Sequence, residues 1–294
     1  MERAICVIVN PQAGGGRAAR LLPRVEAELR GHGLAFRVER TRSLEHAREL
    51  ARAARDAGEI AAGFGGDGLV GAVAGELRHG AGTLAVLPGG RGNDFARKLG
   101  IGGDPAAACA VIAAGRERRV DMAEVDGRVY LGIASAGIDS DVNEIALATR
   151  LPLGGLVYVY GALKALLAWR PAHWEVVIDG TARAFDGYSV AVANTGVFGG
   201  GMYLVPDARV DDGLLDVVLM DDLPKRRYLV NLPKVFKGTH VKAPGLHILP
   251  AREVAFHADR PFTAYADGDP IAALPATVRV APGALRVLAP EAAP

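Results

Sequence analysis

Three glycine-rich segments combine polar side chains with a backbone suited to phosphate chemistry. They read VNPQAGGGR from Val9, GFGGDGLVGA from Gly63 and LPGGRGNDFAR from Leu87, and each follows a short apolar run. Glycines expose backbone N–H groups, and a helix that begins beside them favours negative charge, so such loops can cradle phosphates. An ordinary strand-to-helix turn is the alternative for any one loop taken alone. Three such loops together favour an anion-binding site.

A further acidic turn lies in the second half of the chain. The segment PDARVDDGLLDV places Asp211 and Asp212 before Gly213 and an apolar run. A carboxylate with loop carbonyls and water supplies the hard oxygen ligands that Mg²⁺ prefers. A hairpin turn without a metal is the alternative.

The first part of the chain alternates strand-like and helix-like runs, which predicts a parallel sheet with crossover helices. The helix from Ser43 to Ala57 has the clearest ends, because Ser43 is a good N-cap and Gly58 a good stop. Since parallel strands end at one edge of a sheet, the three glycine loops should meet there. The expected runs are AICVIVN, Arg17–Arg30, LAFRVERT, Ser43–Ala57, IAAGFGG, Leu69–Arg78 and TLAVLPGG.

Beyond Arg119 the pattern changes to short strand-like segments with turn signals, which predicts an all-β second domain. Helical stretches interrupt it near Ser140–Ala148, Leu156–Trp169 and Lys225–Lys237. We therefore expect a nucleotide-binding α/β domain over residues 1–122 and a β-sandwich domain over residues 123–283. Residues 284–294 are expected to return to the first domain.

Composition excludes several functional classes. Lys plus Arg number 34 and Asp plus Glu 33, a net charge of +1 that favours no nucleic-acid partner. Cys6 and Cys109 lie in apolar contexts, which indicates buried thiols and a cytoplasmic location. The seven histidines lack zinc-site spacing. No secretory signal or membrane span is expected, since the apolar stretch Leu153–Trp169 is interrupted by glycines and a lysine.

The ordered motifs NPQAG, GGDG, PGGRGND, PDARVDDGLLDV and DGDP resemble those of the diacylglycerol kinase catalytic family, whose relatives include the sphingosine kinases. The resemblance covers nearly the whole chain. It implies an N-terminal doubly wound parallel-sheet domain like that of NAD kinases and diacylglycerol kinases, a C-terminal β-sandwich domain, and an active site in the cleft between them that uses ATP and Mg²⁺.

The resemblance also assigns nucleotide contacts by position. Three residues depart from the family pattern: Leu69 and Arg91 replace threonines, and Ala72 replaces a glutamate. We therefore expect backbone amides to bind phosphate, with Arg91 adding charge. The residues expected to contact ATP are Asn10, Pro11, Gln12, Ala13, Gly14, Thr41, Gly65, Gly66, Asp67, Gly68, Leu69, Gly90, Arg91, Asn93 and Asp94.

The same resemblance implies catalytic and metal-binding roles. Asp269, in place of the family's glutamate, would accept the proton of a lipid hydroxyl as it attacks the γ-phosphoryl group. Asp67 would orient its loop or hold a magnesium-bound water, and Asp121 would help arrange magnesium and nucleotide, a simple hydrogen bond between domains being the alternative. A structural Mg²⁺ would be bound by Asp212 with the carbonyls of Arg209 and Leu214.

The resemblance thus predicts an ATP- and Mg²⁺-dependent lipid kinase that acts on a hydroxyl of diacylglycerol or a related lipid. A kinase of soluble substrates like NAD kinase, and a weakened or silent binding protein, are the alternatives. Peripheral, transient contact with a membrane and a possible homodimer are expected. The apolar residues Leu151, Leu153, Leu156, Val157, Tyr158 and Tyr160 either line an acyl pocket or touch the bilayer, with Arg150, Lys164 and Arg170 near headgroups, or belong to a helix packed on the sandwich.

Overall fold

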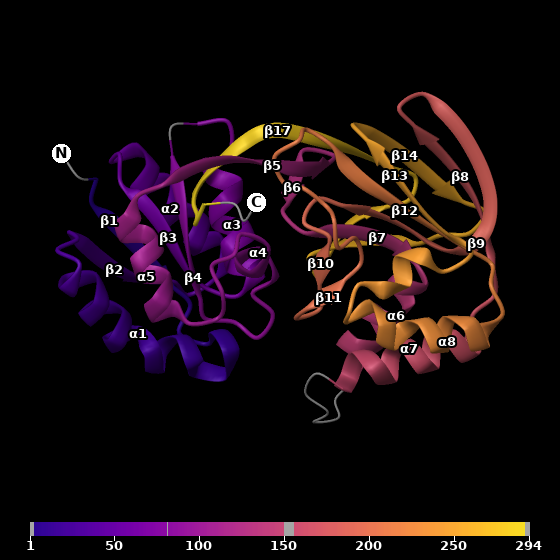
Figure 1. The fold of residues 1–294 in the computed structure, drawn as a ribbon, viewed down its shortest axis with the longest axis horizontal. Helices are drawn as coiled ribbons and strands as arrows, with labels where there is room; N and C mark the ends of the chain where they lie inside the picture. Colours follow the sequence, from indigo (N-terminus) through magenta and orange to yellow (C-terminus); the bar gives the residue numbers. More distant parts are fainter. Residues whose placement is uncertain (1–2, 81, 150–155, 292–294) are drawn as a thin grey trace. The chain divides into compact units, whose positions relative to one another are not determined.

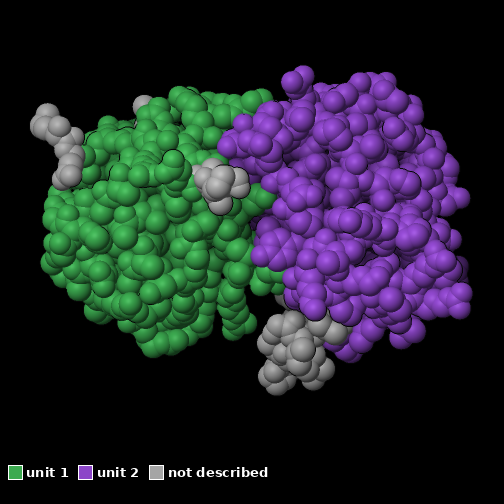
Figure 2. Space-filling model, viewed as in Figure 1, with its two compact units in different colours: residues 1–122, 199–201, 282–294 green, residues 123–198, 202–281 purple. Residues whose placement is uncertain are grey.

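The computed structural model describes residues 3–80, 82–149 and 156–291, and these divide into two compact units (Figures 1 and 2). Unit 1 comprises residues 1–122, 199–201 and 282–294, and unit 2 comprises residues 123–198 and 202–281. Two strands, β5 and β17, pass from one unit into the other. Among the residues that the structure describes, no helix is long and apolar enough to cross a bilayer. Arg150, Leu151 and Leu153 lie outside the described residues.

Unit 1 is an α/β unit with a parallel sheet in the order β17-β4-β3-β1-β2. Every residue of β1, β3 and β4 is buried, because helices cover both faces of the sheet, as is usual for parallel strands (Figure 1). The elements are β1 (Ile5–Val9), α1 (Ala13–Gly31), β2 (Phe36–Arg40), α2 (Leu44–Asp56), β3 (Ile60–Gly65), α3 (Asp67–Leu77), β4 (Thr83–Pro88), α4 (Asp94–Lys98), α5 (Pro105–Ala114) and β5 (Glu117–Val125).

The helices of unit 1 follow local sequence signals. Ser43 caps α2 by accepting a hydrogen bond from the His46 N–H group, as the sequence predicts. The three glycines Gly14–Gly16 have positive φ, so the regular part of α1 starts after them, close to the predicted Arg17. The helix continues through Pro23, which is exposed. Cys6 and Cys109 are both buried, as expected.

Unit 2 is built on antiparallel strands in the order β16-β15-β7-β9-β8-β14-β17, with β12 joining β9 and β13. The helices α6, α7 and α8 occupy the three predicted stretches. Its elements are β6 (Arg128–Tyr130), β7 (Ile133–Gly137), α6 (Ile138–Ala148), α7 (Leu156–Ala168), β8 (Ala172–Ile178), β9 (Thr181–Ala193), β10 (Val197–Phe198), β11 (Met202–Tyr203), β12 (Leu215–Asp221), α8 (Lys225–Val235), η1 (Thr239–Lys242), β13 (Leu246–Ala251), β14 (Glu253–Ala258), β15 (Thr263–Ala266), β16 (Asp269–Ala273) and β17 (Ala276–Leu288).

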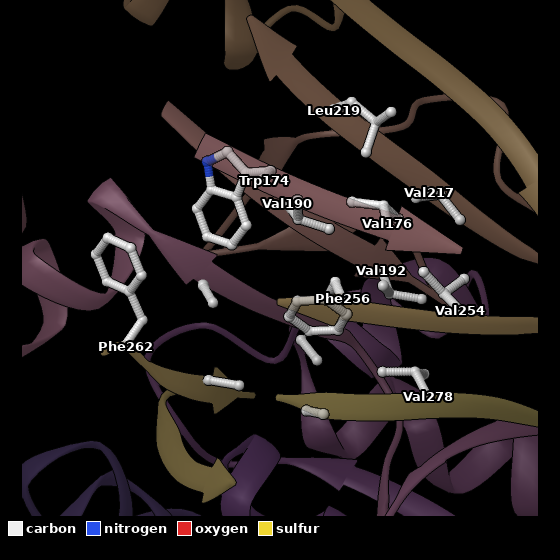
Figure 3. Packing of buried hydrophobic residues seen from close by; sticks show 14 of the residues in the cluster. Trp174, Val176, Val190, Val192, Val217, Leu219, Val254, Phe256, Phe262 and Val278 are labelled. Atoms are coloured by element: carbon white, nitrogen blue, oxygen red, sulfur yellow. The ribbon is translucent and has the colours of Figure 1, made fainter. Parts of the chain in front are cut away.

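Aromatic and β-branched side chains fill the core of unit 2 (Figure 3). Strand β8 alternates buried and exposed residues, which places Trp174 and Val176 on its inner face. Trp174 stacks on Phe262 with ring centroids 5.4 Å apart. Close packing of this kind gives the loops at the ends of the strands a rigid base.

The last strand, β17, belongs to both units. Its first half pairs antiparallel with β14, and its second half pairs parallel with β4, where Arg286 lies opposite Thr83. The sheet of unit 1 is therefore completed by the last strand in the chain.

Candidate functional site

The carboxyl ends of β1, β3 and β4 lie side by side in unit 1. Val9 is opposite Phe64, and Gly65 is opposite Pro88, in parallel register. The Gly89 N–H group donates a hydrogen bond of 2.8 Å to the Gly65 carbonyl, which joins the second and third glycine loops. All three predicted phosphate loops therefore leave the sheet at one edge.

Close backbone contacts explain the glycines of these loops. A Cβ atom on Gly90 would lie 2.4 Å from the Gly66 Cα, and one on Gly14 would lie 2.6 Å from the Gly89 oxygen. Gly14 also has a φ of 60°. Only residues without a side chain allow this approach. The surface of the loops is therefore formed by backbone atoms, and a side chain on Gly14 or Gly90 would clash with the neighbouring loop.

Three polar side chains predicted to contact nucleotide hold the loops in shape. The Asn93 Oδ1 accepts from the Gly90 N–H group at 2.9 Å, and its Nδ2 donates to the Gly90 carbonyl at 3.1 Å. The Asn10 Oδ1 accepts from the Gln12 N–H group. The hydroxyl of Thr41, which follows β2 at the same edge, donates to the Ser43 carbonyl at 2.6 Å. These three side chains hold in place the loop backbone that would face a ligand.

The remaining predicted residues of the loops contribute mainly backbone. Gly68 lies in the first turn of α3, where N–H groups have no acceptor one turn earlier in the helix. The Gln12 carbonyl accepts from the N–H groups of Gly15 and Gly16, which shapes the first loop. Pro11 and Ala13 flank Gln12 in the same loop.

Two arginines at the loops have different surroundings. The Arg17 guanidinium donates to the carbonyls of Gly90 and Gly103, so it holds the loop after β4 in place. Arg91 is exposed, and its Nη2 lies 4.0 Å from where a Cβ on Gly15 would stand. Arg91 is therefore the better placed of the two to meet an anion over the first loop.

Two aspartates bridge segments of unit 1. The Asp67 Oδ1 accepts from the Phe95 N–H group at 3.1 Å, and the Asp94 Oδ2 accepts from the Gly200 N–H group at 2.9 Å. Burial raises the pKa of Asp94, and the nearby charge of Asp67 raises it further. Asp67 thus links the start of α3 to α4, and the two roles predicted for it stay predictions. The Gly199–Gly201 run resembles a loop of the family, but the sequence assigned no role to Gly200.

Leu69 and Ala72 are two of the residues that differ from the family pattern, and their side chains point into the protein. Both side chains are buried, and Leu69 packs directly over Gly65. The missing hydroxyl and carboxylate are replaced by core contacts at the start of α3. Neither side chain faces the loop edge, so the predicted phosphate contacts of this turn would come from its backbone N–H groups.

Asp121 lies on β5 and is 2% exposed. Its Oδ1 accepts a 2.7 Å hydrogen bond from the Gly283 N–H group on β17. Arg119, two residues earlier on β5, donates to the Gly283 carbonyl. Asp121 therefore ties β5 to β17 within unit 1, and a contact with nucleotide or magnesium stays a prediction.

Two neighbouring aspartates of unit 2 occupy different environments. Asp267 and Gly268 form a two-residue hairpin turn between β15 and β16, with φ values of 52° and 93°. The Asp267 carboxylate accepts hydrogen bonds of 3.0 to 3.3 Å from the N–H groups of residues 131–133. Both aspartates are exposed, but the Asp269 side chain, at the start of β16, has no such bonds to backbone N–H groups. Asp267 is thus a structural acceptor, and Asp269 is open to a substrate.

The predicted magnesium loop lies before β12. The Asp212 Oδ1 accepts from the Leu214 N–H group at 3.0 Å, while Arg209 pairs with Asp211. Because β12 begins at Leu215 with no strand directly before the loop, this segment is no hairpin turn. One exposed carboxylate beside loop carbonyls suits a hard, largely hydrated cation such as Mg²⁺. Among the described residues, no three or more acidic, His or Cys side chains form a cluster that could hold a metal ion, and Mg²⁺ binding at Asp212 stays a prediction.

An additional titratable residue, Asp139, lies in the first turn of α6 and was not singled out in the sequence. Burial raises its pKa to about 6, and the charge of Asp141 adds to this effect. Hydrogen bonds from Ser189 and Ser135 act in the opposite direction. A carboxyl group in a sequence gives no signal of burial, which depends on the strands that α6 covers.

The fold and the loops together define a class of protein: an α/β unit whose three glycine loops meet at one sheet edge, joined to an antiparallel β unit with an exposed acidic hairpin. Comparison with known proteins finds the same two parts. Residues 4–125 match the diacylglycerol kinase catalytic domain, and residues 132–289 match the YegS C-terminal NAD kinase beta sandwich-like domain.

Relatives match over nearly the full length. A diacylglycerol kinase of Mycobacterium tuberculosis is 33% identical over 98% of this chain and 95% of its own. A Pseudomonas aeruginosa protein named as a probable lipid kinase, YegS-like, is 32% identical over 99% of this chain and 95% of its own. The crystal structure of a diacylglycerol kinase from Bacillus anthracis shares the fold, with a TM-score of 0.78, 19% identity, and coverage of 99% and 98% of the two chains.

The chain belongs to the diacylglycerol kinase catalytic family of lipid kinases. Membership makes it a phosphotransferase with an alcohol group as acceptor. The family and the fold class predicted from the ordered motifs are thus confirmed.

Proposed function

We propose that the protein is an ATP- and Mg²⁺-dependent kinase that phosphorylates a hydroxyl group of diacylglycerol or a related lipid. The observation that carries the proposal is the convergence of three glycine loops at one sheet edge, where Gly90 and Gly66 touch through backbone alone. Such a surface presents N–H groups to the phosphates of a nucleotide. The names of the relatives supply the class of acceptor.

In the proposed reaction, unit 1 binds and orients the nucleotide. Backbone N–H groups of the loops and the Arg91 guanidinium hold the phosphates, and Asp67 keeps the second and third loops in register. Magnesium, when bound with ATP, would neutralise charge on the phosphates. A second ion at Asp212, with the carbonyls of Arg209 and Leu214, would brace the loop before β12.

Asp269 is the proposed general base. Its exposed carboxylate would orient the lipid hydroxyl and accept its proton as the oxygen attacks the γ-phosphorus. Asp267 holds the hairpin through three N–H groups and so fixes where Asp269 stands. In this proposal Asp267 positions the hairpin, and Asp269 accepts the proton.

The test is transfer of labelled γ-phosphate from ATP and Mg²⁺ to a panel of lipids in mixed micelles. We expect transfer to at least one glycerolipid, and Asp269→Asn to lower kcat by about 10² to 10⁴ with an unchanged free energy of unfolding. The matched variant Asp267→Asn should instead lower stability by about 1 to 3 kcal/mol. ATP binding without transfer to any lipid would refute the proposal, as would full activity of Asp269→Asn.

A further inference from the structure

The outer face of α7 in unit 2 is apolar although it is exposed. On its inner face, Ala162, Ala165 and Leu166 are buried in the core. On its outer face, Tyr160, Leu163 and Leu167 are 40%, 44% and 81% exposed, at the i, i+3 and i+7 spacing of one helical stripe. A helix that is apolar on both faces is normally covered on both. The fold of unit 2 covers only one.

The neighbouring helix α8 shows the same property. None of its residues is buried. Leu229 and Val230 are exposed on it, and Phe236 is exposed directly after it. Of the eight large hydrophobic side chains that are exposed in the described part of the chain, these and the three on α7 make six. Single exposed hydrophobics are ordinary, but such a concentration marks an interaction surface.

Contacts between the two helices join them into one surface. The Lys225 Nζ, at the start of α8, donates a 2.8 Å hydrogen bond to the Leu167 carbonyl on α7. Trp169 after α7 and Tyr228 on α8 both stack on Tyr188, with centroid distances of 5.7 and 5.3 Å. Figure 1 shows both helices along the same border of unit 2.

The two helices and the residues directly after them carry a surplus of basic side chains, while Glu144 on α6 and Asp222 before α8 are the nearest exposed acids that precede them in the sequence. Residues 225–242 contain six basic residues and no acidic one, and residues 145–174 contain no Asp or Glu. The chain as a whole carries a net charge of only +1, so the surplus is local. Apolar side chains with Lys and Arg on the same helices suit the boundary of an anionic bilayer. A second copy of the chain would bring the same basic residues to the contact, and repulsion opposes that pairing.

We propose that α7, α8 and Phe236 form the surface with which the protein docks on an anionic lipid bilayer. The side chains of Leu163, Leu167 and Val230 would enter the headgroup region, and Lys234 and Lys237 would meet anionic headgroups. The proposal rests on the proposed function in one respect, since a lipid kinase must reach its substrate at a bilayer. Vesicle binding can nevertheless be measured without nucleotide and without turnover.

The experiment is sedimentation of the full chain with phosphatidylcholine vesicles and with equimolar phosphatidylcholine and phosphatidylglycerol vesicles, in the absence of ATP. We expect the wild-type protein to bind the anionic vesicles at least tenfold more tightly. The double variants Leu163→Glu/Leu167→Glu and Lys234→Glu/Lys237→Glu should each lose at least tenfold of that affinity.

Two control variants carry single changes of the same kind elsewhere. Leu44→Glu places the same charge at a leucine of unit 1 that is 40% exposed, and Arg183→Glu reverses an exposed charge on β9 of unit 2. Both should bind anionic vesicles as the wild type does. Circular dichroism and transfer to a dispersed short-chain diacylglycerol establish that the helix variants remain folded and active.

Three results would overturn the docking surface: no vesicle binding by the wild type, equal binding by the helix variants, or light scattering that shows a dimer which only the helix variants disrupt. The last would assign the surface to self-association. Vesicle binding with no transfer to any lipid would instead refute the kinase function and leave the docking surface standing. The two proposals therefore fail separately.

Discussion

At the scale of single residues, environment rather than residue type separates the roles of the charged groups. Arg17 and Arg91 lie near the same loop, yet Arg17 is bound to two carbonyls while Arg91 extends over Gly15. Asp267 and Asp269 differ in the same way. The sequence names the candidates, and the hydrogen-bond partners decide which of them remain open to a ligand.

Arg91→Ala should weaken ATP binding by about tenfold, about 1.4 kcal/mol, because a charge that faces the phosphates is lost. Isothermal titration calorimetry with ATP and Mg²⁺ measures this. Arg183→Ala is the control, since it removes another exposed arginine, from β9 of unit 2. Unchanged affinity of Arg91→Ala would mean that this arginine does not compensate for the threonine at that position.

Asp139→Asn should change how stability depends on pH. Its folded pKa of about 6 lies above the ordinary value of 3.8, so the folded protein holds this proton between pH 4 and 6 and the unfolded chain does not. The stabilising contribution is complete below pH 4 and is lost as the pH rises through 6. At pH 7.5 the Asn variant should therefore be about 1 to 3 kcal/mol more stable than the wild type.

Urea unfolding at pH 4.5 and pH 7.5 tests this, because the difference between variant and wild type isolates the single carboxyl group. The advantage of the variant should shrink at the lower pH. An equal difference at both pH values would show that Asp139 titrates normally.

At the scale of elements, the packing of loops depends on glycine at particular points. Gly90→Ala should force apart the loops after β3 and β4, since its Cβ would overlap the Gly66 Cα. We expect a loss of about 1 to 3 kcal/mol in stability and of measurable ATP affinity. Gly71→Ala in α3 is the control. A Cβ there meets no atom within 4 Å, and Ala should stabilise the helix by about 0.5 to 1 kcal/mol.

Thermal unfolding and calorimetric titration with ATP distinguish the two variants. The view of the loops as a backbone cradle would be wrong if Gly90→Ala bound ATP as well as Gly71→Ala does.

The elements themselves were largely predictable, because hydrophobic periodicity and caps are local properties. The runs ending at Asn10, Gly66 and Gly90 gave the strands of unit 1 and their shared edge. The contact between Asp94 and Gly200 was not predictable in this way, since it joins segments more than 100 residues apart. The outer face of α7 was also unclear, because apolar periodicity does not reveal which side a helix buries.

At the scale of the whole molecule, the two units are not consecutive lengths of chain. Unit 1 takes the strand between β4 and β5 from the second half of β17, and the Asp121 carboxylate accepts a hydrogen bond from the Gly283 N–H group of that strand. A fragment that ends near residue 122 would leave β4 with an open edge. The nucleotide loops therefore depend on residues at the far end of the sequence.

Leu285→Ala should lower the stability of unit 1 by about 2 to 5 kcal/mol, because its side chain is fully buried on β17 beside β4. ATP should then protect less against urea. Leu229→Ala, on the exposed face of α8, should change stability by less than about 0.5 kcal/mol. Urea unfolding followed by circular dichroism, with and without ATP, makes the comparison. Equal effects of the two substitutions would show that β17 is dispensable for unit 1.

The split membership of β17 has a consequence for biosynthesis. A ribosome finishes every residue of unit 2 before it adds the strand that closes the sheet of unit 1. Until then the nascent chain carries β4 with an unsatisfied row of amides and carbonyls, which invites pairing with other chains. The first unit to be translated is thus among the last parts to be completed, and cellular chaperones would be needed most in that interval.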